Sequence, residues 1–330
     1  RTDRVTASGI RLEILSYADL ITILARAYLT HMRSEPGDDL RSALAAAIAD
    51  ENDAAPAAAV EPGLTRQDVD DIRMALERSF CGHPHLALLA ASAFWASFAA
   101  MAPRSSRASR RRLTSFLWGG LAEFDAYAAT LGEALDALNN ASEILCANDA
   151  VVHSENGVLD TVHPASVLSA GTLLDGNGDG SVEVRTRHSG PLRLPRRSLA
   201  ALAAEIVVYS EASRTGRARD FDVLHVPLPP VDIAPRQGVG PHWSPMAGGH
   251  QEAEWLSQVF MQAKTLPLAD RLVDRLDITA MVAVPAPDRP LPISIAALLT
   301  RWVSFAAGET PRERDANGDV LVVAAMADQT

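Results

Sequence analysis

The stretch that decides the predicted fold is ITAMVAVP at residues 278–285, a short apolar run ended by a proline. Apolar residues then recur at helical spacing from Ile295 to Ala306, and a second apolar run, DVLVVAAM, occupies residues 319–326. Apolar strands separated by a helix are typical of a parallel sheet that is buried on both faces. This pattern predicts an α/β fold with a mostly parallel sheet.

Two further apolar runs upstream, at 205–209 and 221–226, extend the same predicted sheet. Ligands of such sheets bind outside the carboxyl ends of the strands. We therefore expect three segments to meet on one functional rim: HVPLPP at 225–230, VPAPD at 284–288 and MADQT at 326–330.

The first half of the chain has a different period, that of amphipathic helices. Two helix starts carry capping boxes, formed by Ser16 with Asp19 and by Thr65 with Asp68. A short strand, IRLEIL, precedes the first helix. The sequence thus predicts an edge strand of the α/β core at 1–16, a helical insertion at 17–150 and the α/β core itself at 151–330.

Composition excludes several classes of function. The net charge of -11 disfavours attraction to nucleic acid or to anionic membranes. Two cysteines cannot form a disulfide framework, and no secretory signal is present, so we expect a cytoplasmic protein. The uncharged stretch at 86–102 is short for a membrane span and rich in alanine, which favours a buried core helix.

One segment resembles the beginning of a calcium-binding loop. In DGNGDG at 175–180, Asp175, Asn177 and Asp179 occupy alternate positions, but Thr186 stands where a bidentate glutamate belongs. The flanking residues have strand character. We therefore predict a glycine-rich hairpin turn and keep a calcium site as the alternative.

The histidines and arginines that could bind ligands match no established site. CGHPH at 81–85 and the pair His242 and His250 fit no zinc spacing, so no metal site is predicted. The arginine run at 104–112 could bind phosphate, but without interleaved aromatic residues a solvated loop at a helix start is favoured. Lys264, the only lysine, lies in a predicted helix without a glycine loop, so the chain lacks a phosphate-binding loop.

Four segments carry a resemblance to a known family: RLEILSYADLITILARAY (11–28), SFLWGGLAEFDAYAATLGEAL (115–135), LRLPRRSLAALAAEIVVY (192–209) and ITAMVAVPAPDRPLPISIAALLTRWV (278–303). Together they resemble the SrfC-like virulence factors of bacteria, large proteins that begin with a GTPase-type P-loop domain. The resemblance runs through nearly the whole chain. It implies an interior fragment, with the phosphate loop and switch threonine upstream of Arg1 and a large helical region after Thr330.

The resemblance also aligns the strand end at 225–228. Where the family has an aspartate, two residues and a glycine, this chain has His225, Val226, Pro227 and Leu228, so only the proline is kept. The aspartate would help to hold Mg²⁺, and the glycine would let the backbone approach the terminal phosphate. Neutral histidine is a poor partner for Mg²⁺, and leucine adds a side chain at the close approach.

The family's base-reading motif is reduced in the same way. Of its threonine, lysine, any residue and aspartate, only Asp328 remains, after Ala325, Met326 and Ala327. Asp328 could accept hydrogen bonds from a guanine edge. An aspartate in an ordinary strand-end turn is the alternative.

We therefore expect a P-loop-NTPase-like α/β fold with a large helical insertion, in which a degenerate GTPase-like domain serves as a binding or scaffolding module for protein partners. The degenerate nucleotide rim comprises His225, Pro227, Leu228 and Asp328. For the chain itself we expect no catalytic residue, metal or cofactor. The alternative is an active divergent GTPase whose phosphate loop lies upstream, with GTP and Mg²⁺ bound by the full-length protein.

Overall fold

The computed structural model describes residues 9–31, 38–53, 64–147, 181–187 and 190–207, with single residues and short segments between 256 and 324. The chain divides into two compact units. The first comprises Arg1–His225 and Pro235–Met261, and the second comprises Val226–Ala234 and Gln262–Thr330.

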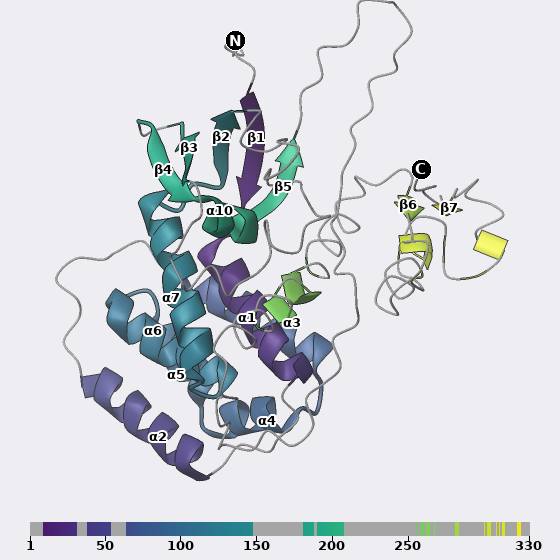
Figure 1. Cartoon of the computed structure of the whole chain (residues 1–330). Helices are drawn as coiled ribbons and strands as arrows, with labels where there is room; N and C mark the ends of the chain where they lie inside the picture. Colours follow the sequence, from purple (N-terminus) through teal and green to yellow (C-terminus); the bar gives the residue numbers. More distant parts are fainter. Residues whose placement is uncertain are drawn as a thin grey trace, which may run out of the picture. The chain divides into compact units, whose positions relative to one another are not determined.

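The first unit contains a five-stranded sheet in which every pairing is antiparallel (Figure 1). Leu12 lies opposite both Ile144 and Ile206 in the strand register, so β1 pairs with a strand on each side. The order in the sheet is β4-β3-β2-β1-β5. The strands are β1 (Gly9–Ile14), β2 (Glu143–Ala147), β3 (Ser181–Arg185), β4 (Leu192–Pro195) and β5 (Ala203–Val207).

The prediction of a mostly parallel, P-loop-type sheet is wrong, because the described chain is mostly helical and its main sheet is antiparallel. The strands of this sheet alternate along their length: in β3, Val182 and Val184 are buried while the residues beside them are exposed. Alternation marks a sheet with one buried face, which is the ordinary antiparallel arrangement. The sequence analysis instead gave most weight to the continuous apolar runs of the second half.

Parallel pairing does occur between two short strands of the second unit. β6 (Met281–Ala283) and β7 (Val322–Ala324) run in parallel, with Met281 opposite Val322. The strands expected at these two places are therefore present. Among the strands that the structure describes, this pair alone is parallel.

The predicted edge strand at the start of the chain has an interior position in the sheet. β1 lies between β2 and β5, while β4 and β5 are the outer strands of the five. The division into parts at residues 16 and 150 stays a prediction. The predicted hairpin turn at 175–180 and its calcium alternative lie outside the described residues; the next described strands, β3 and β4, pair antiparallel.

A helical bundle accounts for most of the first unit. β1 leads into α1 (Tyr17–His31), and α7 (Ala122–Ala137) leads back into β2, so the sheet lies at one end of the bundle (Figure 1). α1 packs against α3 and α7. The helices are α1 (Tyr17–His31), α2 (Asp38–Asp53), α3 (Arg66–Ser79), α4 (Pro84–Ala91), α5 (Phe94–Met101), α6 (Arg107–Ser115), α7 (Ala122–Ala137) and α10 (Arg196–Leu202), with a 3-10 turn, η1 (Phe116–Trp118), before α7.

Both predicted capping boxes are present. The Thr65 side chain accepts a hydrogen bond from the Asp68 backbone N–H, and the Asp68 carboxylate accepts one from the Thr65 backbone N–H. Ser16 and Asp19 form the same reciprocal pair at the start of α1. These bonds satisfy backbone donors that a helix leaves without intrahelical partners.

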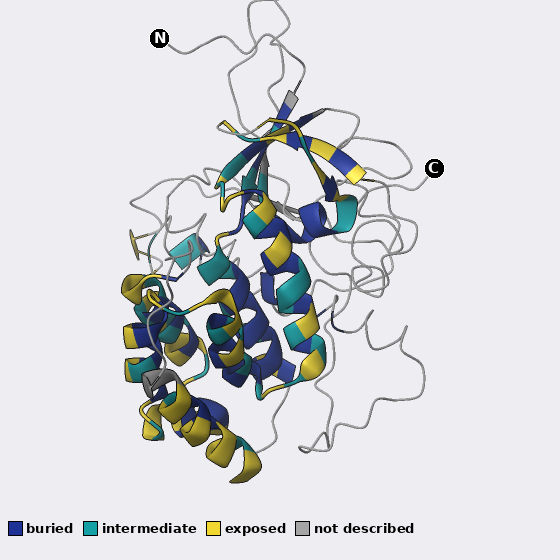
Figure 2. Ribbon diagram, turned by 90° about the vertical axis from the view of Figure 1, so that its left-hand side faces the viewer, coloured by how far each residue is buried: buried dark blue, intermediate teal, exposed yellow. Residues whose placement is uncertain are grey.

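The apolar stretch at 86–102 is buried, as predicted, but it forms two helices. α4 ends at Ala91 with Ser92 as its C-cap, Ala93 takes a left-handed φ of 56°, and α5 continues at an angle of 67°. In the described part of the chain no single helix is long and apolar enough to cross a membrane; α4 and α5 reach that length and hydropathy only as a bent pair. Figure 2 shows the buried side of this bundle against its exposed outer surface.

Candidate functional site

The predicted nucleotide rim cannot be placed in the structure. His225, Pro227, Leu228 and Asp328 all lie outside the described residues. Along the chain, β7 ends four residues before Asp328, and the residues that follow it are also outside. The rim, and its proposed loss of Mg²⁺ and phosphate contacts, therefore stays a prediction.

The two histidines of CGHPH have structural roles, one as a helix cap and one as a buried side chain. His83 caps α4, since its Nδ1 accepts a hydrogen bond from the His85 backbone N–H at 3.2 Å. His85 is buried, while Cys81 is exposed on the loop before it. Where the chain is described, no group of three histidine, cysteine or carboxylate side chains is arranged to hold a metal ion.

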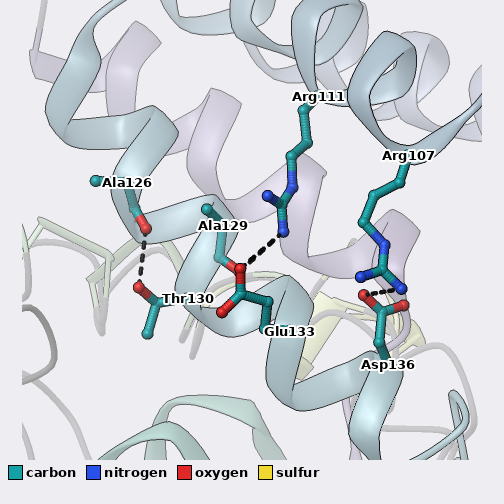
Figure 3. Close-up of polar contacts among 7 residues, drawn as sticks. All are labelled: Arg107, Arg111, Ala126, Ala129, Thr130, Glu133 and Asp136. Carbon is teal, nitrogen blue, oxygen red and sulfur yellow. Dashed lines mark hydrogen bonds and ion pairs between the residues drawn. The ribbon is translucent and has the colours of Figure 1, made fainter.

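The arginine run belongs to a helix and not to a solvated loop. Ser106 caps α6, and the helix then carries four of the arginines. Arg107 pairs with Asp136 at 2.9 Å and Arg111 pairs with Glu133 at 3.3 Å, which joins α6 to α7 (Figure 3). Because the two arginines are one helical turn apart, both face the same side of α7.

The remaining arginines of α6 also have partners inside the fold. Arg110 is only 4% exposed, and its Nη1 donates a hydrogen bond to the Ser105 carbonyl at 2.7 Å. Arg112 lies 3.6 Å from Asp50 at the end of α2. Since Arg110 is buried within the bundle and Arg112 links α6 to α2, the structure favours packing over phosphate binding as the role of the run.

A sharp turn at Trp118, Gly119 and Gly120 separates η1 from α7. Gly119 and Gly120 have left-handed φ values of 65° and 72°. The Gly120 N–H donates to the Ser115 carbonyl at 2.9 Å, which closes the turn before α7 begins. Two consecutive left-handed residues are tolerated here because glycine has no Cβ.

The side chain of Trp118 is held by a carboxylate. Its Nε1 donates to Asp125 at 2.8 Å, and the other oxygen of Asp125 accepts a hydrogen bond from Ser115 at 2.8 Å. Trp118 is buried and its ring stacks on Phe124 with centroids 6.4 Å apart. Asp125, in the first turn of α7, thus links this helix to Ser115 and Trp118, which lie before the glycine turn.

Tyr28 and His85 complete this cluster from two other helices. Tyr28 of α1 lies edge-on to His85, with ring centroids 5.0 Å apart, and also contacts Phe124 at 6.2 Å. His85 Nε2 lies 2.8 Å from the Phe116 carbonyl, to which it donates. We call the cluster of Trp118, Gly119, Gly120, Asp125, Tyr28 and His85 the Trp118 corner.

Burial keeps the titratable rings of the Trp118 corner neutral near pH 7. It lowers the pKa of His85 to about 4 and raises the pKa of Tyr28 to about 12. A general acid or base works best with a pKa near the operating pH. The corner is therefore suited to holding helices together and is poorly suited to proton transfer.

Sequence analysis missed most of the Trp118 corner. The tryptophan–glycine segment was recognised only as part of a family resemblance, and its aspartate was given no role. The available signal was the glycine pair after Trp118, which marks a left-handed turn, followed by Asp125 within reach of the indole. Nothing local to the sequence indicates the contacts of Tyr28 or His85.

Asp125→Ala is expected to lower the free energy of unfolding by about 2 kcal/mol, because the buried indole N–H of Trp118 would lose its acceptor. Asp125→Asn keeps one side-chain oxygen and should cost less. Urea denaturation followed by tryptophan fluorescence measures both. Asp71→Ala is the matched control, since Asp71 accepts a bond from Gln67 on an exposed helix face and its loss should change little.

Lys264 is the other unusual side chain. It lies in a helical segment, as predicted, but it is only 4% exposed. Burial lowers its pKa from 10.5 to about 7, because an ammonium group is poorly solvated there. The single lysine of the chain is therefore partly neutral at physiological pH.

Comparison with known proteins gives the chain a family. The sequence model of a family described as "Putative bacterial virulence factor" matches residues 2–330, so the chain belongs to this family. This confirms the bacterial virulence part of the resemblance. The narrower SrfC-like assignment stays a prediction. No curated protein matches, and no solved structure matches.

Proposed function

We propose that this chain is a binding module of a bacterial virulence factor and that it works through contacts with other proteins. One observation carries the proposal: the side chains best suited to chemistry in the described part are engaged by the fold. Asp125 bonds Trp118 and Ser115, and His85 bonds the Phe116 carbonyl. Side chains that are engaged in this way stabilise the fold and are not available for a chemical reaction.

The active-GTPase alternative depended on a parallel P-loop-type sheet. With an antiparallel main sheet, that alternative loses its basis in the fold. A binding role does not depend on the direction of the strands. It requires an ordered surface on which a few apolar and arginine side chains are exposed.

The outer face of the sheet offers such a surface. Leu145, on the central strand β2, is 38% exposed, and in the described part only Met74 on α3 is a more exposed large apolar residue. In the strand register, Leu145 lies directly between Arg11 and Arg185. Arg11 pairs with Glu143 at 2.9 Å and Arg185 with Glu183 at 3.3 Å. We propose that a protein partner binds this face, with an apolar side chain over Leu145 and polar groups that complement these ion pairs.

Site-specific photo-crosslinking in the parent bacterium tests this proposal. A photoreactive residue at Leu145 is expected to give a discrete crosslinked partner, whereas the same residue at the exposed Ala126 on α7 should not. Arg185→Glu should abolish the product at Leu145, because it reverses the charge beside it. A chain that gives no crosslink at Leu145, or the same product at both positions, contradicts the proposed surface.

The proposal also predicts that the chain alone does not bind nucleotide. Thermal melting with Mg²⁺ and millimolar GTP or ATP should show no shift, whereas a ligand at about 100 times its Kd would stabilise the fold by about 2.7 kcal/mol. A rise in Tm that is specific for one nucleotide would contradict the proposal.

A further inference from the structure

His85 is buried in a setting that accepts only its neutral form. It is the second residue of α4 and has no exposed surface. The Phe116 carbonyl can only accept a hydrogen bond, so Nε2 carries the ring proton. Nδ1 is buried without a hydrogen-bond partner. A protonated ring would therefore have a second N–H donor and no acceptor for it.

The groups that face His85 compensate a positive charge only in part: the Phe116 carbonyl favours the protonated ring, but burial outweighs it. From α1 it meets the uncharged ring of Tyr28, and from η1 the Phe116 carbonyl. His83 lies beside it on the same chain segment, and its positive form would repel a second one. The carboxylate of Asp125 on α7 is engaged by Trp118 and Ser115.

One further feature opposes protonation. His85 lies in the first turn of α4, where the backbone N–H groups make the helix end positive. A protonated His85 can gain the solvation that it lacks in the bundle only by exposure to water.

Exposure of His85 requires α4 to leave its place. α4 and α5 contact each other, and their inward residues are apolar, including Leu88, Leu89, Phe94 and Phe98. No aspartate, glutamate, lysine or arginine occurs between residues 84 and 102. We propose that protonation of His85 in acid releases α4 and α5 from the bundle before its other helices open.

The direction and size of the effect follow from proton linkage. The pKa of His85 is about 4 in the folded bundle and about 6.5 when the ring is exposed. Between these values the opened form binds a proton that the closed form does not, so falling pH favours opening. The opening constant should rise about tenfold for each pH unit, and roughly 300-fold across the whole window.

Hydrogen exchange of the whole chain, corrected for the intrinsic rate at each pH, measures this opening. Between pH 6.5 and 4.5, the protection of amides in α4 and α5 should fall about tenfold for each unit. The amides of α7 in the same samples should show a smaller slope. Equal slopes in α4, α5 and α7 would mean that the bundle opens as one unit and would overturn the proposal without any variant.

Two substitutions separate His85 from its neighbour. His85→Gln places an amide nitrogen where Nε2 donates to Phe116 and removes the titration, so the pH slope in α4 and α5 should disappear. His83→Asn keeps a cap acceptor and should leave the slope unchanged. If His85→Gln keeps the tenfold slope, or if His83→Asn removes it, His85 is not the acid sensor.

Discussion

Gly119→Ala is expected to lower the free energy of unfolding of the helical bundle by about 3 kcal/mol. Two costs combine at this position. The φ of 65° places an L residue in the left-handed region. A Cβ there would also lie 2.7 Å from the hydroxyl oxygen of Tyr28, whose ring is fixed between His85 and Phe124. Urea denaturation of the purified variant measures the loss.

Gly120→Ala is the matched control for the backbone cost alone. Its φ is 72°, but a Cβ at Gly120 would meet nothing within 4 Å. It should therefore cost about 1 kcal/mol. If Gly119→Ala costs no more than Gly120→Ala, the close approach to Tyr28 is not what requires glycine.

A double mutant identifies the atom responsible. Tyr28→Phe removes the hydroxyl, after which the nearest ring atom lies 3.2 Å from the alanine Cβ. The loss in Tyr28→Phe with Gly119→Ala should be smaller than the sum of the two single losses by about 1 kcal/mol. Strict additivity would show that the clash is relieved elsewhere.

Lys264→Met is expected to flatten the dependence of stability on pH above neutrality. The pKa of Lys264 is lowered to about 7 by burial, from 10.5 in the unfolded chain. As pH falls from 10.5 to 7, the unfolded chain takes up the proton first. Wild-type stability should therefore fall by about 1.4 kcal/mol for each pH unit relative to the methionine variant. Urea denaturation at pH 7, 8.5 and 10 gives this difference.

The pKa itself can be read directly, since the chain contains no other lysine. Lysine labelled with ¹³C at Cε gives one signal, which should titrate near pH 7 in the folded protein and near 10.5 in urea. Lys264→Arg is the matched control, because arginine stays charged and should lose stability at every pH without the slope. A folded-state titration near 10 would show that the amine is well solvated.

Much of the local structure could be predicted from the sequence. The capping boxes at Ser16 and Thr65 depend on residues three positions apart, and the structure has both. The strands that became β6 and β7 were also expected from short patterns. These features are set by neighbours along the chain, which is why local patterns are sufficient to find them.

The sequence alone determined membership in the bacterial virulence factor family, the helical first half and the position of these short elements. The tertiary structure decided the direction of the strands and the partners of the buried polar groups. An apolar run can pair in either direction, and β5 pairs antiparallel with β1, a partner nearly two hundred residues away that no local pattern indicates. Likewise Tyr28, His85 and Trp118 come from separate elements, and only packing brings their side chains into one corner.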